Sequence, residues 1–245
     1  MRTFVHLSTM ATACLVTACA TADTGGSSDD PDGPVPVEPD GSVPIDAPLV
    51  IDAPLMQTVT LSQTSVMTIK AENSIACTNA AGTAPNSYYR VFRLADHGIT
   101  RPFTAQRIDF GVEHADAGGA ATSQAVTVRL HTLTGAFISS NLVTVAGQVA
   151  TVNDTTTGAI IPVELSPAPT IQPTATVVAE VFVPDGRTAG NHFFIGSNDA
   201  VETGPSYLKA ADCGASEPIT FDAAAASLPA PRPVVRILLS ITGVY

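Results

Sequence analysis

The polar residues with the clearest chemical potential lie between positions 185 and 202. Carboxylate and amide oxygens supplied by loops are the ligands that Ca²⁺ prefers, so these residues are candidates for a calcium site. Asp and Asn are also common turn formers, because their side chains hydrogen-bond to the nearby backbone. The sequence therefore leaves a calcium site and a set of ordinary turns as alternatives for Asp185, Asn191, Asn198, Asp199 and Glu202.

Catalysis would need an activated nucleophile, a metal ion or a matched acid and base. The sequence contains no Gly-x-Ser-x-Gly turn, His-Glu-x-x-His helix, glycine-rich phosphate loop or EF-hand loop. The five histidines are scattered along the chain, and His131 is expected on the polar face of a strand. These observations favour a protein that is not an enzyme, with a hydrolase of unrecognised site as a less favoured alternative.

Aromatic side chains are the remaining candidates for ligand contact, because a glycan-binding surface normally presents aromatic faces. The chain has no Trp and four Tyr. Adjacent strand residues face opposite sides of a sheet, so only one of Tyr88 and Tyr89 is expected at the surface, while Tyr207 follows a Pro-Ser turn. We retain Tyr88, Tyr89 and Tyr207 as candidate ligand-binding residues, with packing in the core or at its rim as the alternative for each.

The amino terminus has the order of a secretory signal peptide, with Arg2, an apolar run and small residues before Cys19. The run is too short for a membrane span. The sequence LVTAC at 15–19 resembles a bacterial lipobox, whose cysteine receives a diacylglycerol group. This resemblance implies a signal peptide at 1–18 and a lipid anchor on Cys19. The alternative is an ordinary signal peptide cut near Ala18 or Ala20.

The residue after Cys19 helps to predict which membrane the lipid-anchored protein reaches. In Gram-negative lipoproteins, Asp at this position tends to retain the protein at the inner membrane, whereas this chain has Ala20. The resemblance therefore implies a lipid-anchored protein of the cell envelope, at the outer membrane of a Gram-negative bacterium. Whether the folded part faces the periplasm or the outside is left open.

Residues 19–56 are rich in Gly, Ser, Asp and Pro and include the near-repeat IDAPLVIDAP at 45–54. With few large apolar groups, this segment cannot bury enough surface to offset the entropy cost of ordering. We therefore expect a disordered tether. It holds eight of the chain's 22 acidic residues and none of its 11 basic residues. The net charge of -11 disfavours binding to the phosphates of nucleic acids.

The cysteine count predicts one disulfide bond. If Cys14 leaves with the signal peptide and Cys19 carries lipid, Cys77 and Cys213 are the cysteines that remain. An isolated pair in an exported chain is most simply a disulfide. The sequence shows no Cys-x-x-Cys motif for redox chemistry and no Cys/His spacing typical of a zinc site. We expect the bond Cys77–Cys213.

The part at 57–245 is dominated by period-two alternation of apolar and polar residues, as in Val126, Val128 and Leu130, which share one face of a predicted strand. Turn sequences such as DAGG at 116–119 separate the apolar runs. We expect an all-β domain, a two-layer antiparallel β-sandwich of jelly-roll type. Its predicted strands are 58–61, 66–70, 88–94, 108–112, 125–133, 142–152, 159–165, 176–183, 193–197 and 233–244.

A series of motifs occurs in order over about 74–243. They are NSYYRVFRL at 86–94, RIDFGVE at 107–113, VFVPDG at 181–186, FFIGSN at 193–198 and PSYL at 205–208, followed by Cys213-Gly214. In this order they resemble a β-sandwich accessory module of the kind appended to secreted bacterial peptidases and other exoproteins. The resemblance implies a role in binding, targeting or stabilisation and supplies no active-site residues. The catalytic domain that usually precedes such a module is replaced here by the lipobox and tether.

Together, these features predict a non-catalytic binding or adhesion-type module tethered at the envelope surface. Its expected partners are the membrane, through the lipid on Cys19, and a glycan or an envelope protein. A structural envelope lipoprotein that is a subunit of an assembly is the alternative function. No cofactor is expected apart from the candidate calcium, and the oligomeric state is left open.

Overall fold

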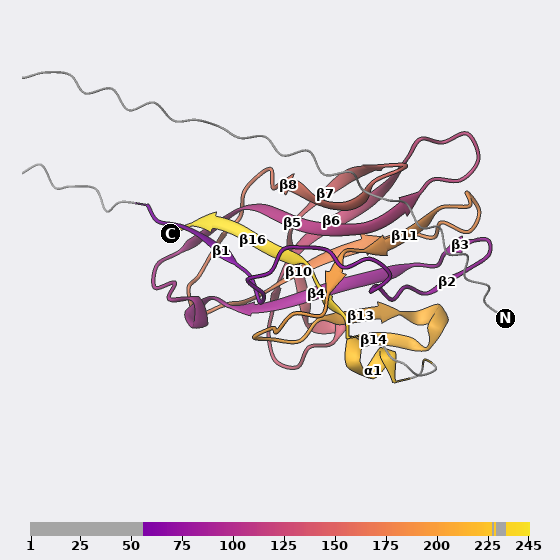
Figure 1. The fold of residues 1–245 in the computed structure, drawn as a ribbon. Coiled ribbons are helices and arrows are strands. Elements are labelled where there is room, and N and C mark those ends of the chain that lie inside the picture. Colours follow the sequence, from indigo (N-terminus) through magenta and orange to yellow (C-terminus); the bar gives the residue numbers. More distant parts are fainter. Residues whose placement is uncertain (1–55, 227, 229–233) are drawn as a thin grey trace, which may run out of the picture. The chain divides into compact units, whose positions relative to one another are not determined.

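The computed structural model describes residues 56–226, 228 and 234–245, which form a two-layer β-sandwich (Figure 1). The expected signal peptide, Cys19 and all of the expected tether except Met56 lie outside these residues. The strand pairings within the described part are antiparallel. The predicted all-β sandwich is therefore confirmed. No helix in the described part has the length and apolar character that a membrane crossing needs.

The first sheet has six strands, which are β1 (Thr58–Leu61), β5 (Phe103–Asp116), β8 (Thr157–Glu164), β9 (Thr170–Ile171), β11 (His192–Ile195) and β16 (Leu239–Val244). Its centre is β5, because this long strand has partners along both edges. β16 and β11 pair with one edge of β5, and β9 and β8 pair with the other. β1 extends the sheet beyond β16.

The second sheet also has six strands, which in spatial order are β14 (Ala215–Thr220), β13 (Tyr207–Ala210), β4 (Asn86–Arg93), β10 (Thr176–Val183), β6 (Ser123–Leu133) and β7 (Leu142–Asn153). Short elements lie between the strands of the two sheets. They are the pairs β2 (Thr78–Asn79) with β3 (Gly82–Thr83) and β12 (Ser197–Asn198) with β15 (Arg236–Ile237), the 3-10 turns η1 (Leu94–His97), η2 (Ser139–Asn141) and η3 (Ala211–Cys213), and the helix α1 (Phe221–Ala225).

One apolar core lies between the two sheets. In β10 the residues Val177, Ala179, Val181 and Val183 all belong to this core, as period-two alternation requires when one face of a sheet is buried. Large rings from other strands, such as Phe110 of β5, are fully buried against them. Removing this apolar surface from water is the main term that stabilises the sandwich. The opposite face of the second sheet is then left for polar groups.

Two glycines allow β5, β11 and β15 to meet at one point. The Gly196 amide donates to the Gly111 carbonyl over 2.7 Å, and the Leu238 amide donates to the Gly196 carbonyl over 2.9 Å. A Cβ atom added to Gly196 would lie 2.6 Å from the carbonyl carbon of Gly111, which is backbone and cannot move aside. The absence of a side chain at Gly196 is therefore required for β11 to leave β5 and continue into β12.

We expect Gly196→Ala to lower the free energy of unfolding by about 3 kcal/mol, because overpacked sites force backbone shifts of this cost. Urea unfolding measures the effect. Gly147→Ala is the matched control, since the nearest atom to its added Cβ is 3.7 Å away, and its expected change is within about 0.5 kcal/mol. Equal stability losses in the two variants would contradict this account of the junction.

The strand predicted at 66–70 is wrong. These residues form no ladder; instead, the side-chain amide of Asn198 donates to the carbonyls of Val66 and Thr68, and the Lys70 amide donates to the Ser197 carbonyl. A side chain that satisfies two carbonyls in this way replaces the backbone partner that a strand would need. The apolar pattern at 66–70 therefore reflects a segment packed along β12 rather than a strand.

The predicted disulfide is confirmed. Cys77 and Cys213 are bonded across 136 residues, with 5.8 Å between their Cα atoms. The bond joins the segment before β2 to η3, which lies between β13 and β14. It therefore ties one end of the second sheet to the loops beside it.

Candidate functional site

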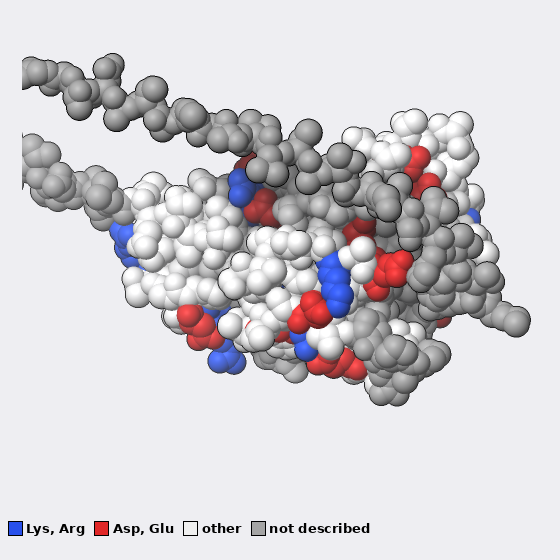
Figure 2. All heavy atoms as spheres, viewed as in Figure 1, with Lys and Arg blue, Asp and Glu red and all other residues white. Residues whose placement is uncertain are grey.

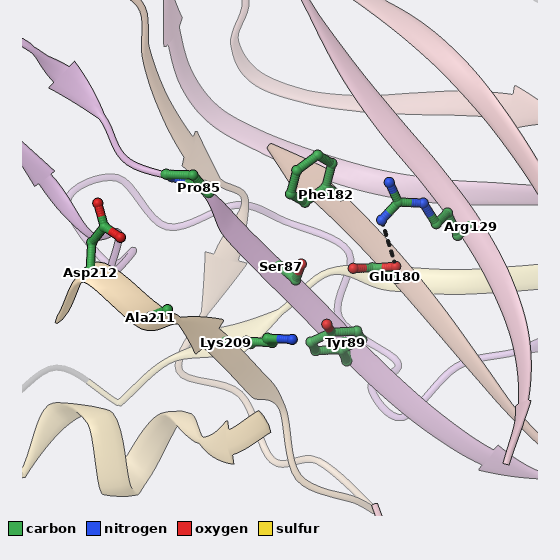
Figure 3. A pocket seen from close by; sticks show the side chains of 9 residues that line it. All are labelled: Pro85, Ser87, Tyr89, Arg129, Glu180, Phe182, Lys209, Ala211 and Asp212. Atoms are coloured by element: carbon green, nitrogen blue, oxygen red, sulfur yellow. Dashed lines mark hydrogen bonds and ion pairs between the residues drawn. The ribbon is translucent and has the colours of Figure 1, made fainter. Parts of the chain in front are cut away.

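A groove of about 300 Å³ lies on the outer face of the second sheet (Figure 3). Its volume is at the lower end of the range for small-molecule sites in proteins. Strands β4, β6, β10 and β13 supply most of its side chains. The groove is lined by Pro85, Ser87, Tyr89, Arg129, Glu180, Phe182, Lys209, Ala211 and Asp212.

Strand register explains why these side chains meet. Tyr89 of β4 stands opposite Glu180 of β10, which stands opposite Arg129 of β6. Two residues further along β4 and β10, Ser87 stands opposite Phe182, with Lys209 of β13 on the other side of Ser87. Directly opposite residues on one face have neighbouring side chains. The groove is thus built from two adjacent cross-strand rows.

Glu180 is the polar centre of the site. Its carboxylate lies 2.8 Å from Nε2 of His131 and 3.1 Å from Nη1 of Arg129, and the residue is only 4% exposed. Burial alone would raise its pKa, but hydrogen bonds from His131 and Ser87 and the charges of His131 and Arg129 together lower the pKa to about 2. At neutral pH the site therefore holds a fixed, ionised carboxylate.

Acid should destabilise the fold through Glu180. Its pKa is about 2 in the folded protein and about 4.3 in an unfolded chain, so the unfolded state binds more protons at acidic pH. The stabilisation, about 3 kcal/mol, is present above about pH 4.3 and is lost as the pH falls toward 2. In urea unfolding between pH 7 and pH 2, Glu180→Gln should flatten this dependence. The exposed Glu164→Gln is the control, and an unchanged slope in Glu180→Gln would contradict the assignment.

The His131 ring is not free to act as a base. Because an ionised carboxylate can only accept, Nε2 donates to Glu180, and Nδ1 lies 3.0 Å from the hydroxyl of Thr144. Arg129 is similarly engaged, since its guanidinium lies over the ring of Phe182 at 4.6 Å as well as against Glu180. Such mutually bonded groups provide orientation and charge, which suits binding better than proton transfer.

A loop crosses the outer face of the second sheet and contacts residues that line the groove. This strap, residues 134–141, connects β6 to β7 and reaches across the sheet to β13 and β14. Its Phe137 packs edge-on against Tyr89 and Tyr207, with ring centroids 5.5 and 4.7 Å away. Ser139 accepts a 2.8 Å hydrogen bond from Lys209 and donates its amide to Glu217. Aromatic packing and hydrogen bonds therefore both hold the strap in place.

The comparisons were made with models of protein families, with curated proteins and with solved structures. None of the three gave a match to this chain.

The three candidate tyrosines lie in different environments. Tyr88 is fully buried on the inner face of β4, where its hydroxyl has no hydrogen-bond partner among the described residues. Tyr89 points to the other face and lines the groove, and burial raises its pKa. Tyr207 is half-buried against Phe137. Tyr88 and Tyr89 face opposite sides of the sheet as expected, but neither is at the surface, since Tyr89 is only 3% exposed.

The calcium candidates are engaged in other contacts. Asp185 pairs with Arg187, Asp199 with Lys70, and Glu202 with Arg90. No group of three or more His, Cys, Asp or Glu side chains suited to a metal ion occurs in the part of the chain that the structure describes.

The two amide candidates hold backbone segments. Asn191 accepts a hydrogen bond from the Gly118 amide. Asn198, which is almost fully buried, accepts from the Ala200 amide and donates to two carbonyls of the segment at 66–68. Each of the five candidates is therefore held by contacts of its own, and those of Asn191 and Asn198 are typical of turn and loop formers.

Sequence reasoning missed the central members of the groove. His131 was expected as a scattered surface residue, but it is 5% exposed and bonded to Glu180. A signal was present, because Glu180 is the one acid in TVVAEVFV at 176–183, and Arg129 and His131 share the polar face of 125–133. A carboxylate within an apolar strand requires a partner. The sequence does not say which strand supplies that partner.

A second hollow, of about 370 Å³, lies on the outer face of the first sheet. Its walls are mostly hydroxyl-bearing side chains, and the hydroxyls of Thr60 and Thr242 bond to each other over 3.0 Å. Its charged members, Arg107 and Asp109, form a pair. The described residues that line it include no aromatic side chain, in contrast to the groove, so the groove is the stronger candidate site.

Proposed function

We propose that this chain is a non-catalytic binding module of the bacterial cell envelope, tethered through lipid on Cys19, and that its ligand binds in the groove on the second sheet. The observation that carries the proposal is the buried carboxylate of Glu180, held by His131 and Arg129 at the floor of a mixed polar and aromatic groove. A site whose side chains are fixed before binding loses little entropy when a ligand arrives.

An envelope glycan fits this groove best. Sugar hydroxyls both donate and accept hydrogen bonds, so one ligand can satisfy the acceptor Glu180 and the donors Arg129 and Lys209 together. Phe182 adds aromatic surface beside these groups. On the face shown in Figure 2, acidic and basic side chains of the described residues lie interspersed rather than in one extended basic area. This mixture supports an uncharged or weakly charged ligand over a polyanion.

The non-catalytic assignment is supported by the protonation chemistry of the groove. The pKa of Glu180, about 2, leaves it without a proton to give at neutral pH. Both nitrogens of His131 face other side chains. A hydrolase is the alternative function, and an assay for substrate turnover would detect it.

Binding to glycan arrays and to whole-envelope fractions tests the proposal. The purified full chain should bind a defined glycan, and Lys209→Ala should weaken that binding at least tenfold because it removes a donor from the groove wall. Lys70→Ala is the matched control, since Lys70 pairs with the exposed Asp199 outside the groove. Absence of binding in both assays, or equal loss in the two variants, would contradict the proposal.

The anchor is tested separately. Cys19→Ala should release the protein from membranes, because it removes the only cysteine placed for lipid attachment by the lipobox at 15–19. Fractionation of cells that make each form measures this. Continued membrane retention of Cys19→Ala would overturn the anchor and leave the groove proposal standing.

A further inference from the structure

The edges of the two sheets differ in how they are protected against pairing with other chains. Charged residues, prolines and short length all prevent a free strand edge from adding another strand. β14 contains Glu217 and Pro218, and β8 contains Pro162 and Glu164. β1 and β11 have four residues each. These edges are protected by composition or by length.

β7 lacks every one of these protections. It has twelve residues, LVTVAGQVATVN, with no charged residue and no proline. It pairs only with β6, and within the described part no other backbone hydrogen bond is made by residues 142–152. At about 3.4 Å per residue its edge is roughly 40 Å long. A long edge without charge or proline is a template for a further strand, and the single register shift in its pairing with β6 leaves residues 146–153 in regular register.

The side chains of β7 add apolar surface at the same edge. Val143 is 61% exposed, Val145 38% and Val149 68%. Val149 stands on the outer face opposite Thr127 of β6, so it is accessible from solvent. Valine fits a paired, half-buried strand well. Both the backbone and the side chains of β7 are thus suited to an additional partner.

We propose that β7 is an association edge, where it pairs antiparallel with β7 of a second copy of this chain. The lack of charge along the strand decides in favour of a second copy, because identical strands can then lie side by side without opposing like charges. A two-fold axis makes the same patch complementary to itself. The result is a continuous sheet that joins the second sheets of two molecules.

Such a dimer leaves the groove accessible. In the second sheet, Tyr89 and Glu180 lie on β4 and β10, and β6 separates them from β7. A two-fold axis perpendicular to the joined sheet places both outer faces on the same side. If the groove binds a glycan, as the proposed function holds, the dimer presents two grooves to one glycan surface. Binding through both grooves increases avidity without new contacts.

Native mass spectrometry and sedimentation equilibrium of the purified full chain test the association edge. The wild-type protein should be a dimer of two identical chains. The double variant Val145→Lys, Val149→Lys places like charges beside each other across the two-fold axis and should raise the dissociation constant at least tenfold. Val201→Lys is the control, because Val201 is 91% exposed and lies outside the strands; it should leave the dimer unchanged.

Hydrogen exchange then locates the contact. Amides at 142–152 should exchange more slowly at dimer-forming concentrations in the wild type and not in the lysine variant, whose circular dichroism should match the wild type. A monomer at all concentrations, a dimer that persists in the lysine variant, or a stoichiometric complex with a different protein would each overturn the proposal. None of these results would alter glycan binding by the groove of a single copy, so the two proposals fail separately.

Discussion

Removing the disulfide, by changing Cys77 and Cys213 together to Ala, is expected to lower the free energy of unfolding by about 5 kcal/mol. The bond closes a loop across 136 residues, and loop closure in the unfolded chain accounts for a stabilisation of this size. Urea unfolding of the oxidised wild type and of the double variant measures the difference. The wild type after reduction should match the variant.

The disulfide should also affect the groove. Cys77 is held independently of the bond, since its amide donates to the Asn86 side chain and its carbonyl accepts from the Ala84 amide. Cys213 ends η3, whose Ala211 and Asp212 line the groove, and Asp212 has a further 2.6 Å contact with Arg187. Without the bond, η3 is therefore the part that loosens.

Hydrogen exchange distinguishes this local effect from global destabilisation. Amides around 211–214 should exchange faster in the double variant, while those of the β4 ladder should change only with global stability. A stability loss below about 2 kcal/mol, or uniform exchange across the sheet, would contradict the assigned role. The comparison is made under native conditions, where η3 can open without unfolding the core.

Much of the fold could be predicted because apolar and polar residues alternate along a strand when one face of its sheet is buried and the other is exposed to solvent. The strands at 58–61 and 176–183 have the predicted bounds. β13 and β14 were missed, since β13 is short and β14 contains Glu217 and Pro218, which are unfavourable in strands. Local pattern thus identifies strands that are long and apolar, and it misses those that tertiary pairing stabilises.

The candidate site could be predicted only in part. Alternation predicted that Tyr88 and Tyr89 face opposite sides of the sheet, but it did not say which of the two lines the groove. The contact of Glu180 with His131 joins residues 49 apart, because β10 lies between β4 and β6. This strand order is a property of the whole sheet, and no local pattern contains it. The calcium candidates were close in sequence, but each is held by partners from other parts of the chain or by its own turn.

Arg90 is expected to give the largest effect of any single side chain in the described part. It is 1% exposed, and its guanidinium donates to the Ile237 carbonyl, the Gly204 carbonyl, the Gln63 side chain and Glu202. One side chain of β4 therefore holds β15 and two loops. Removing one member of a buried charge pair is strongly destabilising, and Glu202 would then keep only its 3.3 Å contact with Arg236 among its ion pairs in the described part.

We expect Arg90→Met to lower the free energy of unfolding by about 4 kcal/mol, because it retains the apolar stem and removes every donor. Arg90→Lys should lose less stability, since its ammonium keeps the charge. It cannot reproduce the planar guanidinium that reaches both Ile237 and Glu202. Arg93→Met, on the same strand but exposed, is the control, with an expected change within about 0.5 kcal/mol. Urea unfolding midpoints rank the three variants. If Arg90→Met were as stable as Arg93→Met, the guanidinium would not be what connects β4 to β15 and the two loops.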